Sequence, residues 1–154
     1  MLWFRIDNRL VHGQVVEAWI PHLGASALVV ANDQLAADPL RQEIMTLAIP
    51  QDLTFVCCRV TELAAVLASI QHRDPHAHIM ILLASCPDAQ LALQSGCSMT
   101  SVNIGNLHDG PGKHQVCAHV CLSEEDRACL LFLQEQGVAL DFRCVPSKPT
   151  TVRL

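Results

Sequence analysis

Short apolar runs rich in β-branched residues alternate with segments of helical periodicity along the whole chain. This alternation is typical of a layered α/β domain, in which helices cover a sheet of strands. Strands are expected over residues 2–6, 26–31, 53–58, 77–83, 100–104, 115–121 and 138–144. The sequence therefore predicts an α/β fold with an open, mostly parallel sheet of about seven strands and helices on both faces.

Capping and breaking residues mark where the intervening helices begin and end. Asp38, Thr61 and Ser123 are the expected N-caps of three helices, and Gly24 is expected to end the first helix. Helices are expected over residues 13–23, 38–49, 61–71, 86–96 and 123–137. A chain of 154 residues without a visible linker or repeat is long enough for one core. We expect a single domain over residues 1–154.

Charge and hydropathy exclude several classes of function. With a formal net charge of −5, the chain has no basic face to neutralise a phosphate backbone, so nucleic acid is not an expected partner. The longest strongly apolar runs, such as 77–85, fall well short of the roughly 20 residues that a membrane-spanning helix needs. We expect a soluble, cytoplasmic protein.

Eight cysteines raise the alternatives of a metal centre or disulfides. No C-x-x-C pair occurs, and most of the cysteines lie among aliphatic residues, where a free thiol packs as a small apolar group. Cys117, His119 and Cys121 would share one face of a strand, but a zinc site needs four ligands and no second cluster is in range. We expect no metal, and the metal or redox interpretation of these three residues is the weaker alternative.

The stretch FRIDNRLVHGQ, residues 4–14, gathers unusual polar chemistry for so apolar a chain. In an open parallel sheet, ligands collect at the carboxyl ends of strands, and Asp7 to His12 would form the exit loop of the first strand. His12 would stand just before a helix amino terminus, which favours an anion. A histidine can act as a base, a metal ligand or a phosphoryl-carrying nucleophile. Arg5 and Arg9 favour the phosphoryl group over a metal cation, although a capping or surface histidine also fits the residues taken alone.

Polar residues also follow other expected strands. Asn32 and Asp33 follow the second strand and Ser85 follows the fourth. We expect these three residues to border the site, because the carboxyl ends of parallel strands meet at one edge. Helix capping or bracing of a loop is the alternative for each of them. Asn103, Gly105 and Asn106 lie at the end of the fifth expected strand and receive no role from the sequence.

The segment RIDNRLVHGQVVEAW, residues 5–19, resembles the amino-terminal motif of the IIB components of the mannose/fructose/sorbose family of the bacterial phosphoenolpyruvate-dependent sugar phosphotransferase system. Residues 29–41, 102–107 and 122–147 resemble further motifs of that family in the same order. The resemblance spans essentially residues 2–154. It implies a protein-histidine phosphotransferase that takes a phosphoryl group from a IIA phosphohistidine and passes it to a sugar held by the membrane components IIC and IID.

The resemblance also implies roles for particular residues. His12 would be the phosphoryl acceptor, Arg9 would neutralise the phosphoryl oxygens, and Asp7 would support the loop or orient the imidazole. Gly13 and Gln14 would offer backbone N–H groups. Arg5 is a further candidate for binding phosphate because it is close to His12 in sequence. The transfer requires no cofactor. The permease partners would hold the protein at the inner membrane surface. A homodimer is an alternative to a single copy of the chain.

The chain departs from the family pattern after the fourth strand. That position commonly reads F-K-[NTS]-P, whereas residues 84–87 read ASCP and contain no lysine. Asn8 and Asn32 also replace residues that are frequently acidic. The motif around His12 is intact, so the departure bears on delivery of the phosphoryl group. The alternative to sugar transport is a regulatory phosphocarrier that signals by its phosphorylation state.

Overall fold

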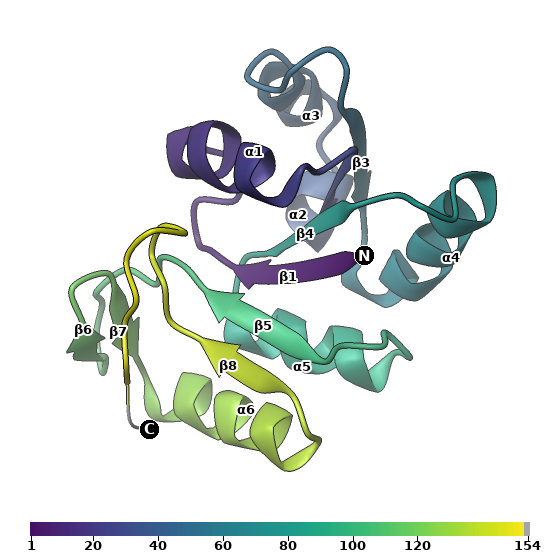
Figure 1. Cartoon of the computed structure of the whole chain (residues 1–154). Coiled ribbons are helices and arrows are strands. Elements are labelled where there is room, and N and C mark those ends of the chain that lie inside the picture. The colour runs from purple at the N-terminus through teal and green to yellow at the C-terminus, as the bar shows by residue number, and fades with distance from the viewer. Residues whose placement is uncertain (153–154) are drawn as a thin grey trace.

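The computed structural model describes residues 1–152 and places six parallel strands in one sheet. The strands are β1 (Leu2–Ile6), β2 (Ala27–Ala31), β3 (Thr54–Cys58), β4 (Ile79–Leu83), β5 (Ser101–Ile104) and β8 (Ala139–Asp141). Their order is β3-β2-β4-β1-β5-β8 (Figure 1), and every neighbouring pair is parallel. The predicted open α/β sheet is confirmed, with six strands in the central sheet of the described chain instead of about seven.

The prediction of a sheet strand over residues 115–121 is wrong. This segment is an antiparallel hairpin of β6 (His114–Cys117) and β7 (Val120–Leu122), which forms a separate two-stranded sheet. Each hairpin arm shows the same alternating pattern as a longer strand, so the pattern concealed the turn. The hairpin is attached at the exit of β5, where Leu107 N–H donates to His119 O at 3.1 Å.

The helices follow the predicted segments with changes at their ends. After β1 a π-helix, Gln14–Trp19, continues into α1, Ile20–Leu23, and Gly24 ends the segment in the left-handed conformation at φ 56°. The other helices are α2 (Asp33–Ala36), α3 (Pro39–Thr46), α4 (Leu63–Arg73), α5 (Cys86–Gln94) and α6 (Glu124–Glu135). The short helix α2 was not expected from the sequence.

Two of the three predicted N-caps are confirmed. Asp38 accepts the Arg41 N–H at the start of α3, and Ser123 caps α6. Thr61 is not a cap, because it lies inside a 3₁₀ turn, Val60–Glu62, that precedes α4. The N-cap residue of α4 is Glu62, whose Oε2 accepts the Arg59 N–H at 3.1 Å at the start of the 3₁₀ turn.

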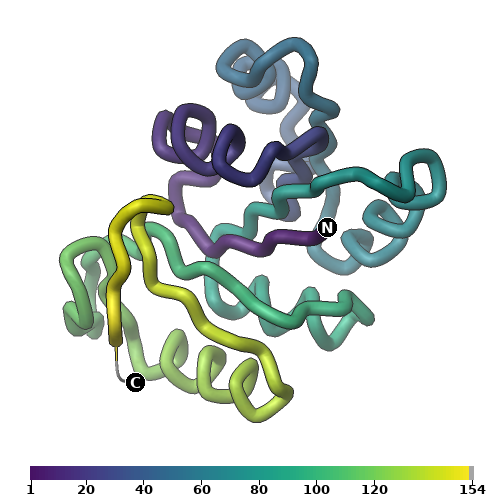
Figure 2. The backbone as a smooth tube through the Cα atoms, viewed as in Figure 1, coloured from purple at the N-terminus to yellow at the C-terminus, as the bar shows by residue number. Residues whose placement is uncertain are grey.

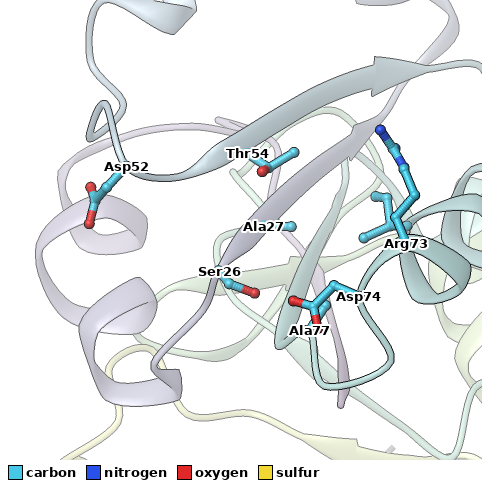
Figure 3. A pocket seen from close by; sticks show the side chains of 8 residues that line it. Ser26, Ala27, Asp52, Thr54, Arg73, Asp74 and Ala77 are labelled. Atoms are coloured by element: carbon cyan, nitrogen blue, oxygen red, sulfur yellow. The ribbon is translucent and has the colours of Figure 1, made fainter.

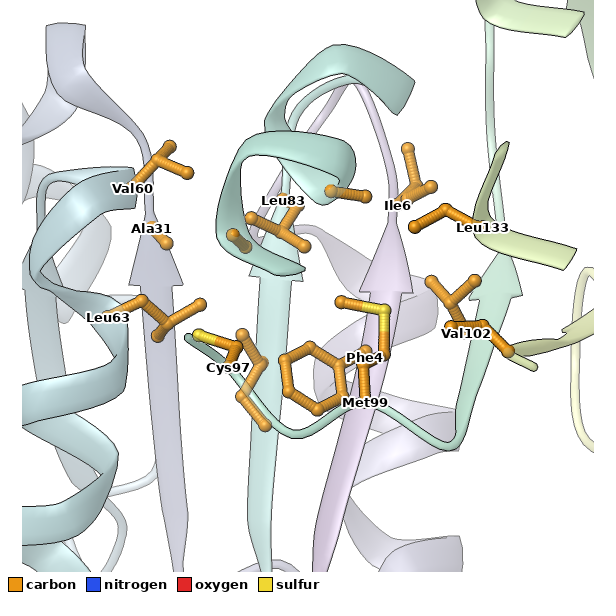
Figure 4. Packing of buried hydrophobic residues seen from close by; sticks show 14 of the residues in the cluster. Phe4, Ile6, Ala31, Val60, Leu63, Leu83, Cys97, Met99, Val102 and Leu133 are labelled. Atoms are coloured by element: carbon orange, nitrogen blue, oxygen red, sulfur yellow. The ribbon is translucent and has the colours of Figure 1, made fainter. Parts of the chain in front are cut away.

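Helices pack on both faces of the sheet because alternate strand residues point to opposite sides. In β2, Ala31 belongs to a large apolar cluster with residues of α4, α5 and α6 (Figure 4). Leu28 and Val30 belong to a second cluster with Trp19 of the π-helix and Leu35 of α2. The expectation of helices on both faces is therefore confirmed. Within residues 1–152, no helix is long and apolar enough to cross a membrane.

The strand order reverses beside β1. The chain leaves β1 for β2 on one side of it, and later crosses from β4 to β5 on the other side. A reversal of this kind opens a crevice at the carboxyl ends of the strands, where α/β proteins bind their ligands. The segment after β8 turns back past the exit of β1 (Figure 2), where Trp19 Nε1 donates to Cys144 O at 3.0 Å.

Candidate functional site: the exit loop of β1

The loop after β1 is tied to both neighbouring strands. Asp7 N–H donates to Leu83 O of β4 at 2.8 Å, and Asn8 N–H donates to Asn106 O after β5 at 2.9 Å. Leu10 then reverses the chain with a left-handed φ of 54°, a conformation that is unfavourable for a residue with a side chain. Burial of the Leu10 side chain in the second apolar cluster holds this turn in place.

Asp7 and His12 face one another across this loop. His12 Nε2 lies 2.9 Å from Asp7 Oδ2, and the His12 side chain is only 7% exposed. His12 Nδ1 is buried and has no hydrogen-bond partner within the described part of the chain. Because an ionised carboxylate can only accept, Nε2 is the protonated nitrogen and Nδ1 keeps its lone pair. The geometry thus fixes one tautomer of the imidazole.

Arg5 binds the Asp7 carboxylate in the interior of the protein. Its Nη2 and Nε donate to Asp7 Oδ2 at 2.8 and 3.1 Å, Nη1 donates to Asn103 Oδ1, and both side chains of the ion pair are 0% exposed. The guanidinium also lies over the Trp19 ring, at 5.3 Å from its centroid. A β-carbon at position 105 would collide with the guanidinium, so only glycine fits beside it.

Asn106 extends the network to the helix after the loop. Its Nδ2 donates to Asp7 Oδ2 at 2.9 Å and to Gln14 Oε1 at 3.1 Å. Gln14 Nε2 in turn lies 3.5 Å from Cys144 Sγ, in the segment after β8. Asp7 Oδ2 therefore contacts Arg5, His12 and Asn106 directly, and Gln14 at the helix start joins the network through Asn106.

These donors decide the charge of Asp7. Burial alone would raise the pKa of the Asp7 carboxyl, but the hydrogen bond from His12, the charge of Arg5 and the hydrogen bond from Asn106 outweigh it. The pKa therefore lies below its ordinary value, and Asp7 is ionised at neutral pH. A permanent negative charge on Asp7 is what keeps the His12 proton on Nε2.

The structure brings together some of the predicted site residues. Asp7, His12, Arg5 and Gln14 share the network, and Arg9 is exposed in the loop with its N–H donating to Asp7 Oδ1 at 3.1 Å. Gly13 is the exposed residue at which the helix begins. Arg5 is occupied by Asp7 and Asn103 and does not reach the surface.

Asn32, Asp33 and Ser85 act as local caps and braces at the exits of β2 and β4. Asn32 Oδ1 accepts the Leu35 N–H at 2.9 Å, Asp33 Oδ1 accepts the Val60 N–H at 2.9 Å, and Ser85 Oγ accepts the Asp88 N–H at 3.2 Å. Over the described residues, no hydrogen bond connects any of the three to Asp7 or His12. Their expected place at the rim of the site stays a prediction.

Sequence reasoning missed Asn103, Asn106 and Cys144 as parts of the network. The first two stood out only as polar residues at a strand end, and Cys144 was one of several cysteines among apolar neighbours. The missing information was that β5 is the neighbour of β1, with Asn103 opposite Arg5 in the register.

Two further features are candidate sites, the cysteine-rich hairpin and a hollow at the other end of the sheet. Among residues 1–152, no group of three or more His, Cys, Asp and Glu side chains could hold a metal ion. Cys117 Sγ lies 3.7 Å from His119 Nδ1, but Cys121 belongs to the other arm of the hairpin. A hollow of about 320 Å³ between Asp52 and Arg73, with mixed polar and apolar lining (Figure 3), lies at the amino ends of β2 and β3, at the opposite end of the sheet from His12.

Comparison with known proteins identifies the family. Residues 1–151 match the family model described as PTS system sorbose subfamily IIB component. The chain belongs to this family. A relative among the curated proteins is the N-acetylgalactosamine-specific phosphotransferase enzyme IIB component 1 of Escherichia coli K12, which is 32% identical over 95% of this chain and 91% of its own length. The resemblance found in the sequence is therefore confirmed.

Solved structures agree with this assignment to the IIB components. The IIBSor domain of the sorbose permease from Klebsiella pneumoniae superposes with a TM-score of 0.88 at 28% identity, over 99% of this chain and 93% of that one. The mannose-specific EIIAB component of E. coli K12 is 30% identical over 94% of this chain, which spans 44% of that longer protein. As a IIB component of a sugar phosphotransferase system, the protein has the role of a transferase.

Proposed function

We propose that this IIB component is a phosphoryl carrier that accepts a phosphoryl group from a IIA phosphohistidine onto His12. It passes the group to a sugar during uptake through membrane partners IIC and IID. The observation that carries the proposal is the Asp7–His12 pair, in which Nε2 is held at 2.9 Å and Nδ1 has no partner in the described chain. A nitrogen with a lone pair, beside exposed Arg9 and a helix amino terminus, suits attack on phosphorus.

Phosphoryl transfer from the donor histidine to His12 requires no cofactor. The lone pair of His12 Nδ1 attacks phosphorus, and the P–N bond of the donor histidine breaks with its electron pair returning to that nitrogen. The His12 proton stays on Nε2, where Asp7 stabilises the partial positive charge of the phosphorylated ring. Positioning and charge stabilisation supply the catalysis.

The surrounding residues divide into two groups. Arg9 and the backbone N–H groups of Gly13 and Gln14 would contact the phosphoryl oxygens, because Arg9 and Gly13 are exposed and the first N–H groups of a helix have no partner within it. We assign Arg5 to holding Asp7, since its guanidinium is fully buried. Asn32, Asp33 and Ser85 would border the site without contacting the phosphoryl group.

His12 must be uncovered before transfer. Its Nδ1 is buried in this structure, and in-line attack requires an open approach to phosphorus. We propose that the loop between Asp7 and Gly13 shifts when a donor arrives, so that Nδ1 faces outward. The left-handed Leu10 is the natural pivot, because its conformation is already strained.

A regulatory phosphocarrier is the second candidate. The observation that favours it is the sequence ASCP at residues 84–87, which lacks the lysine common in the family. The backbone of this segment is bonded to the loop after β1, since Asn8 Nδ2 donates to Ala84 O at 3.0 Å. In either role we expect a cytoplasmic protein. In the transport role, the permease partners would hold it at the inner membrane surface.

The experiment is to incubate the protein with phosphoenolpyruvate, the general carrier proteins and a IIA partner, and to measure bound phosphate. We expect an acid-labile, base-stable label that is lost in His12→Ala and retained in His114→Ala. A label that persists in His12→Ala would remove the proposal. Transfer from the labelled protein to sugar in vesicles containing IIC and IID then separates transport from regulation.

A further inference from the structure

Helix α3 carries an exposed apolar stripe. Leu40, Ile44 and Leu47 are 66%, 60% and 88% exposed, and their spacing places them on one side of the helix and its C-cap. Within the described chain, α3 buries none of its residues, whereas α4, α5 and α6 each bury several. We call these three side chains the α3 patch. Half of the large exposed hydrophobic side chains of residues 1–152 are in it.

The α3 patch lies next to the loop between Asp7 and Gly13, which we call the reactive loop. A hollow of about 270 Å³ is lined by Val11, Arg41, Ile44, Met45 and Ala48. Val11 immediately precedes His12, so this hollow joins the apolar stripe to the loop that carries the acceptor. An apolar stripe next to a reactive residue is typical of a surface that a protein partner covers.

The charges beside the α3 patch indicate what kind of partner. Arg41 lines the hollow, and Arg9 is exposed in the adjoining loop. A partner that arrives with a phosphorylated histidine brings a doubly negative group to these two cations. A second copy of this chain would instead bring its own arginines into the same interface. A sugar hydroxyl on the permease side is neutral and needs no cation outside the reactive loop.

We propose that the α3 patch is the docking surface for the phosphohistidine-bearing donor protein. The inference rests on the proposed function and extends it by assigning the donor, IIA, to a face of the molecule. Apolar contact with Leu40, Ile44 and Leu47 places the donor histidine over the reactive loop, and Arg41 meets its phosphoryl group at the edge of the contact. Docking thereby brings phosphorus into line with His12.

The test uses Ile44→Lys, with Leu91→Lys on α5 as the matched control. Both side chains are exposed leucine or isoleucine on a helix, and α5 lies on the opposite face of the sheet. Transfer from phosphorylated IIA is measured as kcat and KM. Direct labelling by phosphoramidate, which needs no docking, is measured on the same samples, together with the oligomeric state by sedimentation.

We expect KM for phosphorylated IIA to rise at least about tenfold in Ile44→Lys, with kcat, phosphoramidate labelling and the control unchanged. Unchanged transfer in Ile44→Lys, with normal phosphoramidate labelling of His12, would overturn the docking surface and leave the proposed function standing. A native dimer that Ile44→Lys splits without affecting transfer would assign the α3 patch to a second copy and overturn the inference. Failure of phosphorylated IIA to label His12 in the native protein would overturn both proposals.

Discussion

Replacing Asp7 by asparagine separates the charge of this carboxylate from its shape. The buried Arg5 then has no counter-charge within hydrogen-bond distance, in a pair whose side chains are both 0% exposed. Removing one partner of a buried ion pair typically costs about 3–5 kcal/mol, so we expect the free energy of unfolding of Asp7→Asn to fall by that amount. The amide of the new residue can also donate to His12 Nε2, which would move the proton to Nδ1. We therefore expect phosphorylation to slow by at least about 100-fold.

Asp141→Asn is the matched control for the stability effect. Asp141 also pairs with an arginine at 2.8 Å, Arg143, but these side chains are 23% and 31% exposed. Water reaches this half-buried pair and screens it, so we expect its loss to cost about 0.2–1 kcal/mol, as for an exposed ion pair. The contrast between the two variants therefore compares a fully buried ion pair with a partly exposed one at the same N···O distance of 2.8 Å.

The assay is urea denaturation of both variants near neutral pH, repeated toward acid. The pKa of Asp7 is depressed below its ordinary 3.8, so its contribution is complete above that value and is lost as pH falls through the lower native pKa. Asp7→Asn should therefore lose less stability than the native protein on acidification. Equal losses in Asp7→Asn and Asp141→Asn near neutral pH would refute the reasoning from burial.

Three further substitutions test separate contacts. Gly105→Ala should destabilise the protein by about 1–3 kcal/mol, because the added β-carbon meets the buried guanidinium, whereas Gly110→Ala has open space and should be nearly neutral in the same denaturation assay. Trp19→Phe should cost about 1 kcal/mol more than Trp3→Phe, since only the Trp19 indole N–H has a partner within residues 1–152; equal costs would contradict this. Burial lowers the pKa of His119 below its ordinary 6.5. As pH falls, the unfolded chain therefore binds a proton at His119 before the folded chain does, which destabilises the native protein. His119→Gln should lose less stability than the native protein between about pH 7 and pH 5.

The fold could be predicted where local patterns coincide with tertiary structure. The strand from Leu2 to Ile6, its exit loop and the helix after Gly13 followed from apolar runs and from the position of the polar residues. The caps Asp38 and Ser123 followed from short-range hydrogen bonding, which the sequence determines directly. These features need no knowledge of distant contacts.

Other features depend on which strands become neighbours. Arg5 was expected to bind phosphate because it is close to His12 in sequence, yet it points into the molecule, opposite Asn103 of β5. Asn106 contacts Asp7 only because β5 pairs with β1. The hairpin over 114–122 was hidden because both arms share the alternating pattern of one strand. Predicting these features requires the strand order, which short-range patterns in the sequence do not reveal.

The central claim is that His12 carries the phosphoryl group on Nδ1. The measurement is NMR of the phosphorylated protein, with ¹⁵N-labelled imidazoles and ³¹P coupling used to identify the modified nitrogen. We predict one phosphohistidine, at residue 12, bonded through Nδ1, with Nε2 still protonated and hydrogen-bonded to Asp7. Phosphate on Nε2 of His12, or on any other residue, would contradict the account.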